Sequence, residues 1–151
     1  MKKYNKHTFW MLLSLGIWIG LVLGISFMEA PLKFQAPGIT TELGLSIGRL
    51  VFAALNKMEL SCLIVLSIAG APLLKSWGRW YFITFAGLWA LMLGQSFYLL
   101  PILDERAALI IAGAPPPDTW HHLGYVILEG IKIPMLLVLF TLAYRKQART
   151  S

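Results

Sequence analysis

The sequence predicts an all-α protein that forms a four-helix bundle in a membrane, and its composition and the length of its apolar runs are the reasons. The chain has 151 residues, of which 58% are hydrophobic and 13% are charged. The apolar residues gather in runs of about twenty, the length that an α-helix needs to cross the hydrocarbon core of a bilayer. A chain of this size with such runs has no room for a second domain, so we expect one transmembrane domain over residues 1–151.

Each apolar run is expected to form one helix. The expected helices cover residues 8–29, 44–73, 79–101 and 119–144. The first run exceeds the roughly 7–15 residues of a signal-peptide core, so we expect it to be retained as a helix. Short side-chain oxygens accept hydrogen bonds from the free N–H groups of a first turn. The expected caps are Thr40 or Thr41 for the second helix and Asp118 or Thr119 for the fourth.

The charged residues divide between the two ends of the expected bundle. Both termini and the 72–79 loop share one side, which carries bases and no acid: Lys2, Lys3, Lys6, Lys75, Arg79, Arg145, Lys146 and Arg149. The other half carries all seven acids: Glu29, Glu42, Glu59, Asp104, Glu105, Asp118 and Glu129. The positive-inside rule therefore predicts an inner-membrane protein with cytoplasmic termini. The net charge of +6 reflects this orientation, so the expected partner is the lipid bilayer and not nucleic acid.

Polar residues interrupt the second and fourth runs at helical spacing. Steps of +3, +4 and +3 link Arg49, Phe52, Asn56 and Glu59, and the same steps link His122, Tyr125, Glu129 and Lys132. Counted along the helices, Glu59, Gln95 and Glu129 all lie roughly 20–24 Å from the cytoplasmic ends. These side chains are therefore expected to form one polar layer.

Charges at this depth are costly, so we expect them to face the bundle interior and to pair with one another. The expected pairs are Glu29 with Lys33, and Glu129 with Lys132 or Lys57. Together the side chains would line a polar pocket that faces the periplasm. Pro134 would leave the carbonyl of Gly130 without its helical donor, beside this pocket.

The pocket is expected to bind a metal ion or a small substrate. Carboxylates and imidazoles suit zinc, iron or copper, and the candidate ligands are Glu29, Glu59, Glu129, His121 and His122. Adjacent residues of a helix point about 100° apart, so only one of the two histidines can share a site with Glu129. The candidate contacts for a substrate are Asn56, Gln95, Tyr98, Tyr125 and Lys132. Proton exchange between Glu59 and Glu129 is a further use of the same pocket.

Other interpretations of these residues stay open. The charges are also compatible with structural ion pairs, and the chain with an accessory subunit of a larger membrane complex. Gly16, Gly20 and Gly24 form a groove in the first helix that fits a second helix, either within the bundle or in a homo-oligomer or partner subunit. Tryptophans near the run ends are expected to sit in interfacial belts: Trp10, Trp18, Trp77, Trp80 and Trp120. Whether the protein is an enzyme is left open.

Several motifs follow one another in a recognisable order: Gly16-x-Trp18-x-Gly20, Ala30-Pro31-x-x-Phe34, a third helix ending at Pro101, Arg106 soon after it, and His121 with His122 at the start of the fourth helix. This order resembles the four-helix family of transmembrane protein 205 and its bacterial relatives. The sequence departs from that pattern at Gly48–Phe52, where the family has an aromatic-proline stretch. The resemblance implies the four-helix architecture and little about mechanism.

A shorter match concerns the second helix. Asn56-x-x-Glu59 is similar to the Asn-x-x-Glu motif of the glutathione-using membrane enzymes of eicosanoid metabolism, which are also four-helix chains of this size. Those enzymes place an arginine close to the asparagine, whereas Arg49 lies seven residues before Asn56 here. This resemblance implies a glutathione-dependent enzyme as a minority alternative.

Overall fold

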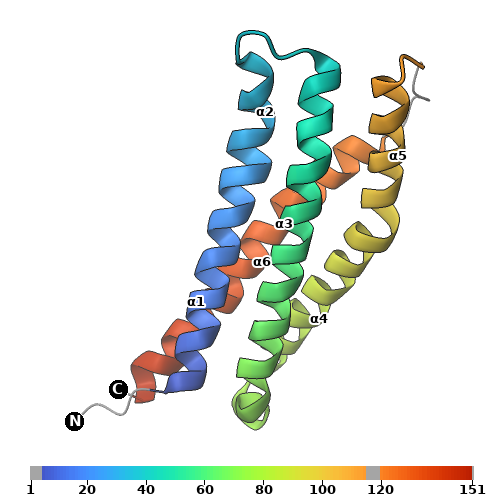
Figure 1. The fold of residues 1–151 in the computed structure, drawn as a ribbon. Coiled ribbons are helices and arrows are strands. Elements are labelled where there is room, and N and C mark those ends of the chain that lie inside the picture. Colours follow the sequence, from blue (N-terminus) through green and yellow to red (C-terminus); the bar gives the residue numbers. More distant parts are fainter. Residues whose placement is uncertain (1–4, 115–119, 151) are drawn as a thin grey trace.

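The computed structural model describes residues 5–114 and 120–150, and this part of the chain is helical almost throughout, with no β-strand. Four of its helices are long and apolar enough to cross a membrane, as the run lengths predicted: Lys6–Gln35, Thr41–Ser76, Arg79–Ile111 and His121–Ala148. The expected caps Asp118 and Thr119 lie outside the described residues, as do Lys2 and Lys3. The first span begins and the last one ends at the same end of the bundle (Figure 1).

The four spans are built from shorter elements. They are α1 (Lys6–Leu21), η1 (Val22–Glu29), α2 (Ala30–Leu32) and η2 (Lys33–Gln35); α3 (Thr41–Gly70) and η3 (Ala71–Ser76); α4 (Arg79–Gly94), η4 (Gln95–Leu99) and α5 (Leu100–Ile111); and α6 (His121–Thr150). Thr40 caps α3 as expected, because its hydroxyl accepts a hydrogen bond of 3.2 Å from the backbone N–H of Leu43.

Two of these elements, η1 and η4, are π-helical, and one residue separates the end of each from a proline. The N–H of Ala30, before Pro31, donates to the carbonyl five residues back, at Ile25. The N–H of Leu100, before Pro101, donates in the same way to Gln95. A proline has no N–H and its ring crowds the carbonyl four residues back, which favours a locally wider turn. The two prolines therefore account for a wide helical turn near the middle of the first span and of the third span.

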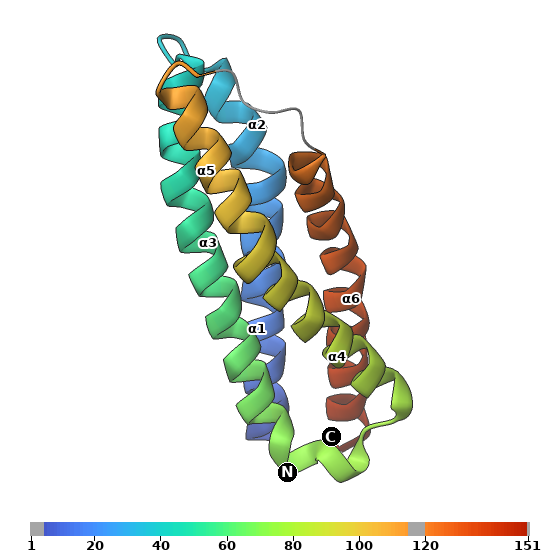
Figure 2. The ribbon, with the colours of Figure 1, turned by 90° about the vertical axis from the view of Figure 1, so that its right-hand side faces the viewer.

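The spans do not run parallel to one another along their whole length. α1 packs against both α3 and α6, while α4 packs mainly against α6 and α5 mainly against α3. The third span thus crosses from α6 to α3, and Figure 2 shows it passing diagonally between them. Because α5 leaves α6, the bundle is less tightly closed at the end remote from the termini.

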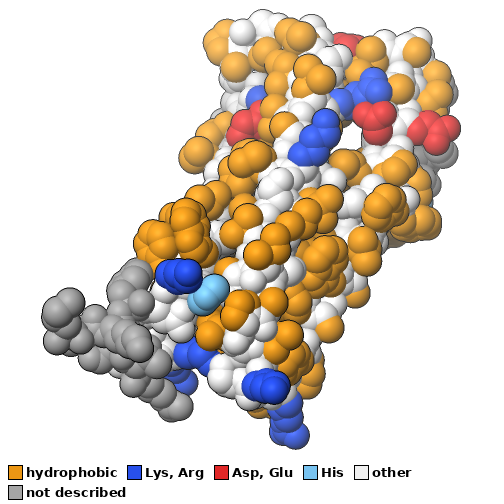
Figure 3. Space-filling model, turned by 60° about the horizontal axis from the view of Figure 1, so that its bottom comes forward, with side chains coloured by type: hydrophobic (Ala, Val, Ile, Leu, Met, Phe, Trp, Pro, Cys, Tyr) orange, Lys and Arg blue, Asp and Glu red, His pale blue; other side chains and the backbone are white. Residues whose placement is uncertain are grey.

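The half of the bundle nearer the termini has an apolar core. Its fully buried members include Met11, Leu15, Leu63, Leu66, Leu88, Leu136 and Leu139. Viewed from the terminal end, the sides of the molecule are largely hydrophobic, and Asp and Glu side chains appear only toward the remote end (Figure 3). The basic end and the acidic half expected from the sequence are therefore both present in the fold.

The glycine groove, which α1 and η1 share, faces outward. A Cβ atom added at Gly16, Gly20 or Gly24 would meet no heavy atom within 4 Å. The prediction that this groove packs against another helix of the bundle is therefore wrong for the described part of the chain. The opposite case is Gly44 of α3, where a Cβ would collide with the ring of Phe34, so a larger residue there would require that ring to move.

Candidate functional site

Three ionisable side chains meet at the centre of the bundle. The ammonium of Lys132 lies 2.5 Å from Oε1 of Glu59 and 2.7 Å from Oε1 of Glu129. The side chains of all three residues are at most 1% exposed. Glu59 comes from α3, whereas Glu129 and Lys132 lie one turn apart on α6. We name these three residues the buried cluster.

Neutral side chains from the other two spans donate hydrogen bonds to the buried cluster. The indole N–H of Trp18 in α1 donates to Oε1 of Glu59 over 2.8 Å. The amide of Gln95 in η4 donates to Oε1 of Glu129 over 2.8 Å, and the hydroxyl of Ser26 in η1 donates to Oε2 over 3.0 Å. Two of these donors lie in the π-helical segments, so the wide turns place polar groups at the cluster.

The hydrogen bonds leave one carboxylate oxygen of the cluster without a partner. Both oxygens of Glu129 accept hydrogen bonds, but Oε2 of Glu59 is buried and has none. Oε1 of Gln95 is a second buried acceptor without a donor. The cluster is therefore short of donors, and it contains two carboxyl groups for one ammonium.

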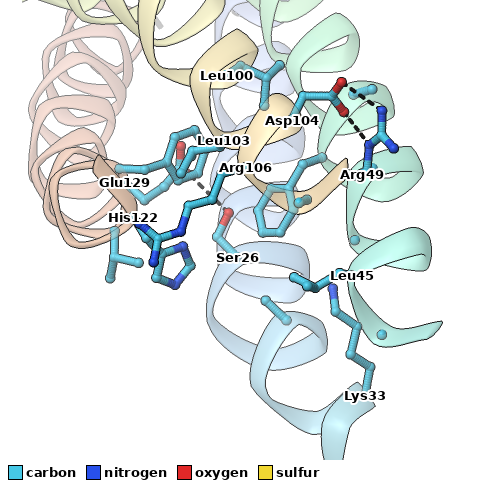
Figure 4. Close-up of a pocket in the computed structure, with 18 of the residues that line it drawn as sticks. Ser26, Lys33, Leu45, Arg49, Leu100, Leu103, Asp104, Arg106, His122 and Glu129 are labelled. Carbon is cyan, nitrogen blue, oxygen red and sulfur yellow. Dashed lines mark hydrogen bonds and ion pairs between the residues drawn. The ribbon is translucent and has the colours of Figure 1, made fainter. Parts of the chain in front are cut away.

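A pocket of about 1000 Å³ lies beside the buried cluster, in the half of the bundle remote from the termini. Its walls come from η1 to η2, from α3, from η4 and α5, and from α6. They are mainly apolar and include Phe27, Phe52, Leu100, Leu103, Ile110 and Val126. Glu129, Ser26 and Tyr125 also line the pocket, and Figure 4 shows Ser26 and Glu129 joined by their hydrogen bond. Glu129 therefore belongs to both the pocket and the cluster.

Charged side chains line the outer part of this pocket. Arg49 forms two hydrogen bonds with Asp104, of 2.6 and 2.8 Å, which join α3 to α5. Lys33 lies 3.4 Å from Glu29, as expected, and its ammonium stands over the rings of Phe34 and Phe52. Arg106 and His122 line the pocket from α5 and α6, and the Arg106 side chain points toward the α6 wall (Figure 4).

The structure brings together most of the polar layer expected from the sequence. Lys132 contacts both Glu59 and Glu129, Gln95 contacts Glu129, and Tyr125 is buried on the adjacent turn of α6. Of the pairs expected for Glu129, the one with Lys132 forms. Lys57 is exposed instead.

Other candidate residues lie away from the cluster. Asn56 donates to the hydroxyl of Ser96 over 2.8 Å and does not line the pocket. Tyr98 is 61% exposed, and its ring contacts the ring of His121 at 6.0 Å between centroids. Glu29 pairs with Lys33, and His122 lines the pocket, as Glu129 does, without joining the buried cluster.

The five candidate metal ligands do not gather in one place. Across residues 5–114 and 120–150, no group of three or more His, Cys, Asp or Glu side chains is arranged to hold a metal ion. Lys132 lies between the two glutamates that were expected to be central ligands. The donor set at this position is therefore that of an ion-pair cluster.

Two members of the site were missed by the sequence interpretation. Trp18 was expected in an interfacial belt, which is wrong because its side chain is fully buried and donates to Glu59. Ser26 had no assigned role. Trp18 and Ser26 both lie on the first span, and 103 residues separate Ser26 from Glu129 in the chain. Their positions along the first span were the only feature of the sequence that could have pointed to the site.

No family model, curated protein or solved structure matches this chain.

Proposed function

We propose that this chain is a multi-pass protein of the inner membrane, with cytoplasmic termini, whose pocket binds a small amphipathic molecule from the periplasmic half. The orientation is supported by the distribution of charge, because the end that holds the termini carries Lys6, Lys75, Arg79, Arg145 and Lys146 and no acid. The pocket lies in the other half, where the acids are found.

The observation that carries this proposal is the sharing of Glu129 between the pocket and the buried cluster. A ligand in the pocket meets mainly apolar walls, the polar groups of Glu129, Ser26 and Tyr125 beside the cluster, and charged side chains at the outer part. Concave apolar sites with a few polar groups are the usual form of small-molecule sites. The ligand chemistry that fits is an apolar body with one polar group, and the polar group would contact Glu129.

A small substrate fits this site better than a metal ion does. The ammonium of Lys132 is within hydrogen-bond distance of both glutamates, and its positive charge would repel a cation placed between them. The glutathione-dependent alternative has less support, because neither Asn56 nor Glu59 lines the pocket. The resemblance to the family of transmembrane protein 205 stays a prediction about architecture.

Pocket occupancy is tested by native mass spectrometry of the protein released from membranes in mild detergent. We expect a small-molecule adduct on wild-type protein that is lost in Ala53→Trp, because Ala53 lines the pocket and an indole there would fill it. Ala54→Trp is the matched control, since Ala54 is exposed on the same helix and does not line the pocket. An adduct that survives in Ala53→Trp, or none in wild type, would contradict the proposal.

The metal alternative is tested on the same preparations by elemental mass spectrometry. We expect no stoichiometric zinc, iron or copper in wild-type protein. Stoichiometric metal that is lost from a folded Glu59→Gln/Glu129→Gln double variant would replace the substrate proposal with a metal site.

A second function, subunit of a membrane complex, is favoured by the open groove of Gly16, Gly20 and Gly24. Grooves of small residues let helix backbones approach closely in membranes, and nothing in the described chain fills this one. The proposed occupant is the same groove of a second copy. Gly20→Leu should then convert a dimer to a monomer in native mass spectra, and a wild-type monomer would rule this out.

A further inference from the structure

The oxygen of Glu59 that lacks a partner carries an inference beyond ligand binding. We propose that Glu59 is a carboxylic acid with its proton on Oε2, that Glu129 is a carboxylate, and that the buried cluster is therefore a binding site for one proton within the membrane-spanning part of the chain. This proposal rests on the cluster itself and does not require that the pocket binds a ligand.

The first step of the argument is the charge of the cluster. Two carboxylates and one ammonium leave a net charge of −1 on side chains that are at most 1% exposed. An uncompensated charge in such surroundings costs several kcal/mol or more. One bound proton makes the cluster neutral.

The second step is the set of groups that face Glu59. Lys132, Glu129 and Tyr125 face it from α6, and Cys62 lies one turn away on α3 itself. Trp18 of α1 donates to Glu59, whereas Gln95 of η4 and Ser26 of η1 donate to Glu129, and these three side chains do not titrate. Lys132 is the cation that forms a hydrogen bond with Glu59.

The third step assigns the proton to one of the two glutamates. Glu129 accepts hydrogen bonds on both oxygens, as a carboxylate does. Glu59 accepts from Lys132 and Trp18 on Oε1 and from nothing on Oε2. A carboxylic acid has one carbonyl oxygen that accepts strongly and one hydroxyl oxygen, so this pattern matches a proton on Oε2 of Glu59.

Gain or loss of this proton would change the net charge of the buried cluster beside the pocket. Glu129 lines the pocket and shares Lys132 with Glu59. A ligand that brought a positive charge to Glu129 would supply the missing charge and release the proton from Glu59. This last consequence rests on the proposed function, whereas the resident proton does not.

The test is infrared spectroscopy of the full chain in lipid nanodiscs, where the C=O stretch of a protonated carboxyl is resolved from carboxylates. At neutral pH we expect this band in wild-type protein and in Glu105→Gln, whose exposed residue serves as the matched control. The band should be lost in Glu59→Gln. It should also be lost in Glu129→Gln, because Glu59 and Lys132 alone are balanced. Absence of the band from wild-type protein, or its presence in Glu59→Gln, would overturn the proposal.

A second pair of variants tests the assignment to Glu59 and needs neither glutamate to be replaced. Trp18→Phe removes a donor to the carbonyl oxygen of Glu59, so the band should move to higher frequency. Ser26→Ala removes a donor to Glu129 and should leave the band in place. The reverse result would place the proton on Glu129. No ligand is added to these samples, and the assignment is taken from which substitution moves the band, so it does not require a ligand in the pocket.

Discussion

Helix α3 carries two charged side chains that bind partners on other spans in very different surroundings. Arg49 pairs with Asp104 through two hydrogen bonds, and the two side chains are 37% and 50% exposed. Glu59, about three turns further along, shares Lys132 with Glu129 at 0–1% exposure. The first site contains one charge of each sign, and the second contains two acids and one base.

The difference shows what burial does to a charged site. An exposed arginine or aspartate that loses its partner can bind water or lipid headgroups instead, so the loss costs little free energy. A buried carboxylate has no such replacement, and every donor around it affects its stability. The buried cluster is therefore expected to respond strongly to substitution and the exposed pair weakly.

The largest effect is expected for Lys132→Met. Methionine fills a similar volume but leaves two carboxyl groups with no cation, and breaking a buried pair costs about 3–5 kcal/mol. We expect a large fall in the detergent melting temperature and in the yield of monodisperse protein. The matched control is Lys57→Met, which changes an exposed lysine on α3. A Lys132→Met protein as stable as this control would show that the cluster does not need its cation.

An intermediate effect is expected for Trp18→Phe. The phenyl ring keeps most of the packing in the core but removes the indole N–H that donates to Glu59, and leaving a buried acceptor without its donor costs about 1–3 kcal/mol. The melting temperature should fall by less than in Lys132→Met. Trp10→Phe is the control, because Trp10 lies on the same helix and is 53% exposed. Equal losses for the two variants would indicate a packing effect alone.

The spans and the polar layer could be predicted from the sequence because both depend on local spacing. Hydrocarbon thickness sets the length of an apolar run, so the four helices follow from run length. The +3 and +4 steps place Glu129 and Lys132 on one face of α6, and depth counting places Glu59 opposite them. These predictions needed no knowledge of how the spans cross.

What the sequence did not predict depends on how the spans cross. The third span passes from α6 to α3, which brings Asp104 to Arg49 and opens the pocket beside Glu129. The π-helical turns change which side chains face inward, and a regular helical count does not include them. Trp18 was misplaced for a related reason, since its partner Glu59 lies on a different span.

The smallest effect is expected for Asp104→Asn. The amide keeps the shape of the side chain and one acceptor oxygen, while the charge that faces Arg49 is removed at a site where both side chains are substantially exposed. The melting temperature should change by a small fraction of the change in Trp18→Phe, and the change should shrink further as salt is added, because salt screens exposed charges. Melting curves of Asp104→Asn and wild-type protein at low and high salt measure both effects. A loss as large as that of Lys132→Met, and insensitive to salt, would mean that Arg49 depends on Asp104 as a buried charge does, and exposure would no longer account for the difference between the two sites of α3.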